Sequence, residues 1–520
     1  MWKKLLITGC VTFSLLSGGT LSAQPSCEIK EEVTSEQLDR TQKELVAMMK
    51  ELKNDSYFQT ELDKAAVQSS LSKRMAAYKD LTVRLLSVLE IQAELEWMKP
   101  EAIQEALGIM KKSSGFDAVL ADKRFGELKS LLAGGFDGIY TGDAQAIDKA
   151  NKTLTLKRKL MLMSPDVNVD KMLTVKFDLG ERANFVGAGS LGIQPNNWSN
   201  LSSASRKNFK AQLVELSGLQ SGELSEKVLY KPAVDGSSVT DLVLNWDGKR
   251  LMFTALDTTR RWQVHELDIN NGEAKQVTNI PEPDLEFFDG TYLPDGRMLA
   301  ISNIGYQGVP CVNGSDAVGN MVLYDPSNGY LRRLTFDQDA NWHPVVMANG
   351  KVMYVRWEYT DLTHYFSRIV MHMNPDGTEQ KSLYGSGSMF PNSIFDVQPL
   401  PKHTNRFVGV ISGHHGVARS GRLMIFDPAK SRKEEKGMIQ ELPFRGRPII
   451  PEVKDELVNG VWPQFIKPYP LTDETFLVTA KLSPYSRWGI YLVDIYDNLT
   501  LVANADDAGM IYSPRSYQTE

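Results

Sequence analysis

All seven histidines of the chain lie within residues 265–415. Four of them stand beside other polar or aromatic side chains, and these are His343, His364, His414 and His415. Neutral imidazole and carboxylate are common ligands of divalent transition metals in proteins. If the fold brings these four histidines together, we expect them to bind a divalent metal such as Zn or Mn.

Cys311 could add a thiolate to such a site. It closes the segment Gly308-Val309-Pro310-Cys311, and two simpler roles are open to it. It could be a small buried apolar residue, or it could form a disulfide with Cys27 in an oxidising compartment. The sequence leaves all three roles open.

An aromatic and acidic segment contains Trp357, Glu358 and Asp361. Aromatic rings stack on sugar rings, and carboxylates accept hydrogen bonds from sugar hydroxyl groups. The segment therefore predicts a carbohydrate-binding surface, although a tryptophan can equally fill the space between two sheets. Trp198 lies in a long polar stretch and predicts a second contact at the surface.

Three arginines, Arg356, Arg368 and Arg419, could together clamp a carboxylate or a sulfate group. Surface ion pairs would explain them as well. The predicted ligand-binding set is Trp198, Trp357, Glu358, Asp361, Arg368 and Arg419.

The part of the chain before residue 160 is expected to be helical after its first 23 residues. From Thr34 to Lys159 apolar residues recur every three or four positions, as in the pair Leu81 and Leu85, which is the period of an amphipathic helix. This stretch opens with the sequence of a capping box. We expect a helical domain at residues 24–160 with four or five helices, of which three or four pack as a small bundle.

Residues 165–515 consist of short β-rich segments in which two units recur. The first unit is a turn followed by an apolar strand, with copies at Asp247-Gly248, Asp295-Gly296 and Asn349-Gly350. The second is an apolar strand that ends in an acid or an amide, with copies at Asp268, Asp325, Asn374, Asp427 and Asp494. The copies of the second unit are 57, 49, 53 and 67 residues apart, and a propeller blade takes about 40–50 residues.

This spacing predicts a β-propeller of six or seven blades, so we expect a mainly β protein with an α-helical N-terminal domain. Five blades carry the repeat. A sixth is expected to begin near Leu173 and to close with residues 209–216, and a seventh could combine strands from both ends of the array. A closed ring covers both faces of each blade and exposes only short sheet edges. It also brings distant side chains to one central channel.

Several of these segments resemble the hydrazine synthase alpha-subunit-like family of exported bacterial proteins. The segments that carry the resemblance are Asn341-Trp342-His343-Pro344, 356–361 with His364 and Arg368, 374–378, and 412–416 with Arg419 and Gly421. The resemblance covers residues from about Lys159 onward and implies the propeller. The Cys-x-x-Cys-His motif of a c-type haem is absent from the sequence, so we expect no haem and do not expect hydrazine synthesis.

Residues 1–23 are typical of a secretory signal peptide, with Lys3 and Lys4 before an apolar stretch and a small-residue cleavage site at Ala23. No later stretch reaches the roughly 18 consecutive apolar residues of a transmembrane helix. We therefore expect a periplasmic or secreted protein with no transmembrane segment. Its 58 basic and 64 acidic residues are intermixed, which disfavours nucleic acid as a partner.

Two functions remain open. The first is a binding role, in which the central face of the propeller recognises an extracytoplasmic ligand or partner. The second is a metal-dependent enzyme, a lyase or a hydrolase acting on an acidic glycan, with the four histidines as ligands or proton carriers. Serine hydrolase, nucleotide hydrolase and nicotinamide-dependent chemistry rank lower because their motifs are missing.

Overall fold

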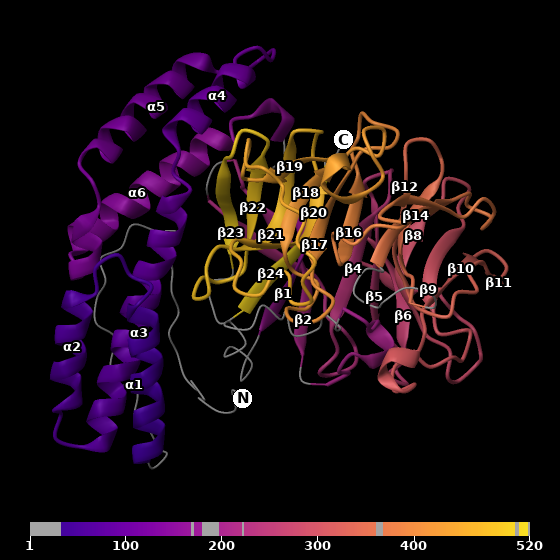
Figure 1. Cartoon of the computed structure of the whole chain (residues 1–520), viewed down its shortest axis with the longest axis horizontal. Helices are drawn as coiled ribbons and strands as arrows, with labels where there is room; N and C mark the ends of the chain where they lie inside the picture. The colour runs from indigo at the N-terminus through magenta and orange to yellow at the C-terminus, as the bar shows by residue number, and fades with distance from the viewer. Residues whose placement is uncertain are drawn as a thin grey trace. The chain divides into compact units, whose positions relative to one another are not determined.

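The computed structural model describes residues 33–167, 171–178, 197–207, 209–220, 223–359, 368–504 and 509–517. The chain divides into two compact units (Figure 1). The helical unit contains the described residues up to Pro165 together with 482–487, and the β unit contains the rest. Residues 482–487 fall inside the range expected for the propeller. They group with the helices instead.

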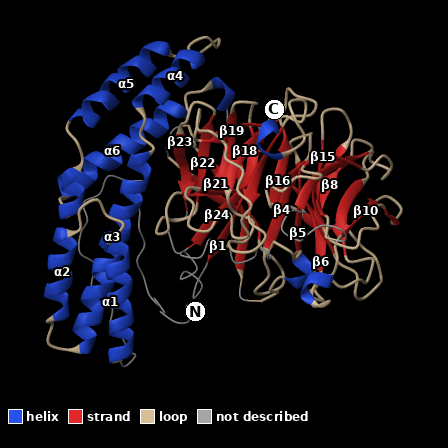
Figure 2. Cartoon of the chain, viewed as in Figure 1, coloured by secondary structure: helices blue, strands red, loops and turns tan. Residues whose placement is uncertain are grey.

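The helical unit contains six α-helices in its described part, rather than four or five (Figure 2). Their bounds are α1 (Ser35–Met49), α2 (Ser56–Ala66), α3 (Leu71–Glu96), α4 (Pro100–Met110), α5 (Ala118–Ala133) and α6 (Ala144–Met161). Over the described part of the chain, none of the helices has the length and apolar character needed to span a bilayer.

The apolar stripe read from the sequence forms the core of this unit. Leu45 of α1 and Leu85 of α3 are fully buried, and α1 and α2 both contact α3. The predicted capping box is confirmed, because the Thr34 hydroxyl accepts from the Gln37 backbone N–H while the Gln37 side chain accepts from the Thr34 N–H. Residues 482–487 belong to this unit through Arg487, which pairs with Glu90 of α3 at 2.7 Å.

The β unit contains five sheets in the described part of the chain. Three four-stranded sheets comprise β4 (Val239–Leu244), β5 (Arg250–Leu256), β6 (Trp262–Asp268) and β7 (Ala274–Gln276); β8 (Phe287–Tyr292), β9 (Met298–Ser302), β10 (Asn320–Asp325) and β11 (Tyr330–Arg333); and β20 (Gln464–Pro470), β21 (Thr475–Lys481), β22 (Gly489–Asp494) and β23 (Leu499–Asn504).

The eight-stranded sheet consists of two four-stranded groups. They are β12 (Asn341–Val346), β13 (Val352–Trp357), β14 (Arg368–Met373) and β15 (Lys381–Tyr384), and then β16 (Ser393–Pro399), β17 (Phe407–Ser412), β18 (Arg422–Phe426) and β19 (Met438–Leu442). In the described part of the chain, the two groups are joined by one parallel pair, Arg368 with Ser393.

The remaining sheet combines the two ends of the β unit. It has the order β24 (Gly509–Tyr517), β1 (Lys171–Asp178), β2 (Lys210–Ser217), β3 (Ser225–Tyr230). The segment near Leu173 and the C-terminal strand therefore build one sheet, not the separate sixth and seventh blades expected. The described residues form six groups of four strands.

Successive groups pack against one another through their inner strands. β4 contacts β8, β8 contacts β12, β12 contacts β16, β16 contacts β20, β20 contacts β24, and β24 contacts β4. The contacts return to the group from which they began, which gives the β unit a propeller-like arrangement. Apolar residues fill the interfaces, with Trp342, Trp357 and Phe395 in one of the larger clusters.

Both recurring sequence units have a structural role. The turns at Asp247-Gly248, Asp295-Gly296 and Asn349-Gly350 join the first and second strands of their groups. The terminal acids stabilise the turn after the third strand. The Asp268 carboxylate, for example, accepts the backbone N–H of Asn270 at 2.9 Å, which is the side-chain cap that makes Asp favourable at a turn.

Candidate functional site

Five inner strands share one irregularity. In β4, β8, β12, β16 and β20, two residues stand opposite one residue of the next strand. The first residue of each bulge has a positive φ of 49–55° and a polar side chain: Asp241, Asp289, His343, Asp396 and Lys467. A left-handed backbone is uncommon for residues other than glycine, and a bulge re-aims the side chain it carries. We call these five residues the polar ring.

Backbone hydrogen bonds between neighbouring groups hold the bulges in place. The Asp289 N–H donates to the Asp241 carboxylate at 3.1 Å, and the His343 N–H donates to that of Asp289. The Lys467 N–H donates to the Asp396 carboxylate at 3.0 Å. Each of these carboxylates thus satisfies the bulge of the next group, which offsets the strain of the left-handed backbone.

The side chains of the polar ring also contact one another. His343 lies between two acids, with Nδ1 3.4 Å from Asp289 Oδ2 and Nε2 3.4 Å from Asp396 Oδ1. Lys467 Nζ lies 2.9 Å from Asp396 Oδ1 and 4.0 Å from Asp241 Oδ1. Each charged group of the polar ring therefore lies near a group of opposite charge or near the titratable imidazole of His343.

The pKa values of the ring follow from burial and from these contacts. Burial alone would raise the pKa of Asp289, but His343 and Lys467 hold it at about 2. Burial likewise opposes ionisation of Asp396, yet Lys467 and His343 lower its pKa. The pKa of Lys467 is raised, because the carboxylates outweigh its burial. The pKa of Asp241 is raised by burial and by the negative charge of Asp289.

A small pocket borders the polar ring. Asn200, Leu201 and Arg419 line it together with ring residues, and its volume is about 10 Å³. That is about the space of one water molecule. Because its charges are paired within the protein, we interpret the polar ring first as a structural element that holds the inner strands together.

Most of the other residues predicted from the sequence form a second cluster. It contains Trp198, Cys311, Trp357, Arg368, His414 and His415, and we call it the arginine–aromatic cluster. The rings of Trp198 and His415 are 5.1 Å apart, and those of Trp357 and His414 are 5.9 Å apart. Cys311 and Tyr359 pack, as Trp198 does, against the core cluster that contains Trp357.

Arg368, the first residue of β14, is buried in this cluster with 1 % of its surface exposed. Its Nε donates to the Asn197 carbonyl, its Nη1 lies 2.5 Å from His414 Nδ1, and its guanidinium stacks on Trp357 at 4.3 Å. Its Nη2 has no hydrogen-bond partner among the described residues. Burial, and then the positive charge of Arg419, lower the pKa of Arg368 to about 9.

Arg419 links the cluster to the polar ring. Its guanidinium lies over Trp342 at 5.3 Å and over Phe395 at 5.2 Å. Burial lowers its pKa to about 10, against the opposing effect of the ring carboxylates, among which Asp396 is the strongest. Trp342 stacks in turn on Trp357, with ring centroids 6.4 Å apart.

The loop that carries His414, His415 and Arg419 depends on its glycines. A Cβ at Gly413 would lie 2.5 Å from the Asp455 carbonyl oxygen, and one at Gly421 would overlap the Ile411 carbonyl oxygen. Real Cβ atoms do not approach backbone that closely, so both positions require glycine. The glycine pattern read from the sequence thus reflects close backbone packing around the histidines.

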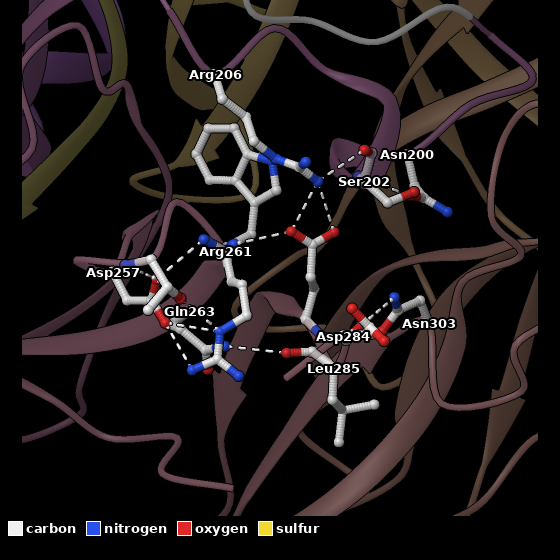
Figure 3. A network of polar contacts seen from close by, with 12 residues as sticks. Asn200, Ser202, Arg206, Asp257, Arg261, Gln263, Asp284, Leu285 and Asn303 are labelled. Atoms are coloured by element: carbon white, nitrogen blue, oxygen red, sulfur yellow. Dashed lines mark hydrogen bonds and ion pairs between the residues drawn. The ribbon is translucent and has the colours of Figure 1, made fainter. Parts of the chain in front are cut away.

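Residues 197–207, in the connection from β1 to β2, cross several groups of strands. Asn197 Nδ2 donates to the Gly413 carbonyl at 2.7 Å, and its Oδ1 accepts from the Arg419 N–H at 2.7 Å. At the other end Arg206 donates to the buried Glu286 at 2.8 Å (Figure 3). The segment is therefore fixed at both ends, which holds Trp198 against the histidines.

Sequence reasoning missed Asp339, which lies just before β12 and is 1 % exposed. Burial raises the pKa of its carboxyl to about 6, although the Tyr359 N–H and the charge of Arg368 both oppose the rise. Its Oδ1 has no hydrogen-bond partner among the described residues. Perturbed carboxyls of this kind are concentrated at functional sites.

The predicted residues are not all brought together. His343 belongs to the polar ring and Glu358 pairs with Arg356, whereas His415 stays in the arginine–aromatic cluster and also pairs with Asp455 at 2.8 Å. Asp361, His364 and Cys27 lie outside the described residues. Within the described ranges, no three His, Cys, Asp or Glu side chains are placed to hold a metal ion, and Cys311 forms no disulfide with another described residue.

The polar ring had a sequence signal that we did not use. Asp241, Asp289 and His343 each stand six positions before the first residue of the repeated turn at Asp247, Asp295 and Asn349. A polar residue at this fixed offset marks the bulge of an inner strand.

No family model and no curated protein matches the chain. Among solved structures, it is similar to a hydrazine synthase from Kuenenia stuttgartiensis, with 14% identity and a TM-score of 0.47 over 66% of this chain and 46% of that one. TolB from Acinetobacter baumannii shows 12% identity and a TM-score of 0.41 over 70% and 72% of the two chains. An oligogalacturonate lyase in complex with manganese shows 12% identity and a TM-score of 0.33 over 55% and 85%. The chain spans less than half of that hydrazine synthase chain.

Proposed function

We propose that the β unit is a six-bladed β-propeller of an exported protein, and that it binds an extracytoplasmic ligand at the arginine–aromatic cluster. The six groups of four strands and their circle of contacts support the blade count. The sequence of residues 1–23 supports export to the periplasm or out of the cell.

The observation that carries the proposal is a pair of unsatisfied polar atoms. Arg368 Nη2 and Asp339 Oδ1 belong to side chains that are each 1 % exposed, and neither has a hydrogen-bond partner among the described residues. Buried polar atoms nearly always have a partner. A bound ligand would supply one.

The surroundings suit a ligand that is partly apolar. Trp198 is half-buried and the His415 side chain is 40% exposed, and both belong to the same cluster as the deeply buried Arg368 and Trp357. Aromatic faces beside a few polar groups are typical of small-molecule and sugar sites.

Titration of tryptophan fluorescence with a panel of neutral and acidic oligosaccharides tests this proposal. We expect Trp198→Ala to weaken binding of any sugar that binds by about tenfold, the usual contribution of one aromatic contact. Trp246→Ala is the control, since Trp246 is 63% exposed in the turn between β4 and β5. A sugar whose affinity is unchanged by Trp198→Ala would contradict the placement of the site.

A second candidate is an enzyme that acts on an acidic glycan at the same cluster. Asp339 favours it, because a carboxyl with a pKa of about 6 can accept and donate a proton near neutral pH. We expect oligogalacturonate to be cleaved by the wild type and not by Asp339→Asn. Absence of new chain ends with the wild type between pH 5 and pH 8 would count against this candidate.

The metal-dependent form of this candidate has its own test. It predicts stoichiometric Zn or Mn in protein purified without chelator. Elemental analysis that finds no stoichiometric metal would overturn this form and leave the binding proposal in place.

A further inference from the structure

We propose that the ligand of the arginine–aromatic cluster carries an oxyanion, a carboxylate in the first instance, which Arg368 binds with the support of the Arg419 charge. This inference rests on the proposed function, because it names the chemical class of the ligand for the same cluster.

The first argument is charge balance. Arg368 and Arg419 are both buried, and neither forms an ion pair within 4.0 Å with a carboxylate of the described residues. Arg422 shows the usual pairing with a carboxylate. Arg422 donates two hydrogen bonds to Glu441, at 2.8 and 2.6 Å. A buried guanidinium without such a partner is rare, since buried charges are normally paired.

The second argument separates the two guanidinium groups. The carboxylates of the polar ring favour the charged form of Arg419 and partly oppose the effect of its burial. Burial and the like charge of Arg419 disfavour the charged form of Arg368, and Cys311, Asp339 and Asp455 oppose them more weakly. The uncompensated positive charge of the cluster is therefore centred on Arg368.

The third argument is the orientation of Arg368. Its Nε is used by the Asn197 carbonyl, its Nη1 faces His414 Nδ1, and its face is covered by Trp357. These contacts fix the plane of the guanidinium and leave Nη2 as the donor without a partner. A fixed guanidinium is well suited to a planar carboxylate, because little side-chain freedom remains to be lost on binding.

Acetate and its neutral isostere acetamide are the probes that test the inference. We expect acetate, compared with NaCl at equal ionic strength, to raise the Tm of the wild-type protein, and acetamide to leave it unchanged. Sulfate that competes with acetate would also support an oxyanion site. Equal effects of acetate and acetamide would overturn the inference.

Arg368→Gln should weaken the acetate response by at least about tenfold, as expected for loss of one charge-assisted hydrogen bond. Arg422→Gln is the matched control and should keep the wild-type response, because its guanidinium already has a carboxylate. An Arg368→Gln response equal to that of the wild type would overturn the inference. If Arg368→Gln does not fold, the comparison of acetate with acetamide on the wild type decides alone.

The two proposals can fail separately. Binding of a neutral sugar that depends on Trp198, without any effect of acetate, would remove the oxyanion and keep the site. An acetate response that depends on Arg368, with sugar affinities insensitive to Trp198→Ala, would keep the anion subsite and overturn the placement of the sugar beside Trp198.

Discussion

Replacing Lys467 by methionine is the sharpest perturbation of the polar ring. The Lys467 side chain is 8% exposed, with Nζ 2.9 Å from Asp396 Oδ1 and 4.0 Å from Asp241 Oδ1. Methionine keeps most of the apolar length and removes only the charge. Among the described residues, the variant leaves the carboxylates of Asp241, Asp289 and Asp396 beside His343 and Arg419.

The expected cost is large compared with total stability. Removal of one partner from a buried ion pair costs about 3–5 kcal/mol, while whole domains are stable by about 5–15 kcal/mol. The charge of Lys467 also lowers the pKa of Asp396. In the variant the folded state should bind protons more readily than the unfolded chain, so its stability should rise as the pH falls from 7 to 5.

Urea unfolding followed by tryptophan fluorescence at pH 7 and pH 5 measures both effects. Lys351→Met is the control, because Lys351 pairs with Glu379 at 2.9 Å where the Glu379 side chain is 53% exposed, and such pairs contribute at most about 1 kcal/mol. A loss below about 1 kcal/mol for Lys467→Met, or the same loss at both pH values, would refute the account of the ring.

Three further predictions concern single residues. Asp289 has a pKa of about 2 instead of 3.8, so its ionised form should stabilise the fold by about 2 kcal/mol above pH 4. Denaturant unfolding should therefore show that Asp289→Asn is less stable than the wild type at pH 7. This difference should disappear as the pH falls to about 2. Burial raises the pKa of Glu94 in α3 to about 7, so ionisation of this carboxyl disfavours folding. Glu94→Gln should therefore raise the Tm at pH 8 and have little effect on it at pH 4. The same change in Tm at both pH values would contradict this assignment. Gly421→Ala should disrupt the loop around His414, because a Cβ there overlaps backbone; unchanged proteolysis of residues 413–421 would show that the loop tolerates the side chain.

The β architecture could be predicted because its repeat is local. A turn such as Asp247-Gly248 and a capping acid such as Asp268 depend only on nearby backbone, so the sequence shows the turn in three of the six groups and the terminal acid or amide in five. The closing sheet was harder to predict. β1 and β24 are at opposite ends of the β unit, and nothing in either strand alone specifies its partner.

The candidate site was predictable residue by residue but not as an arrangement. Trp357, Arg368 and His414 were each recognisable from their types and neighbours, and they do lie together. His343 does not join them, because the bulge of β12 aims it towards Asp289 and Asp396. That separation depends on strand register, which the sequence does not display.

The central claim is that the arginine–aromatic cluster binds a ligand through the unpaired side of Arg368. Crystals of the protein soaked in selenate, a tetrahedral oxyanion with a strong anomalous scatterer, test it most directly. We predict an anomalous peak whose selenate oxygens lie about 3 Å from Arg368 Nη2, the usual distance of an N–H···O hydrogen bond. Selenate found only at other positions, with none beside Arg368, would contradict the claim.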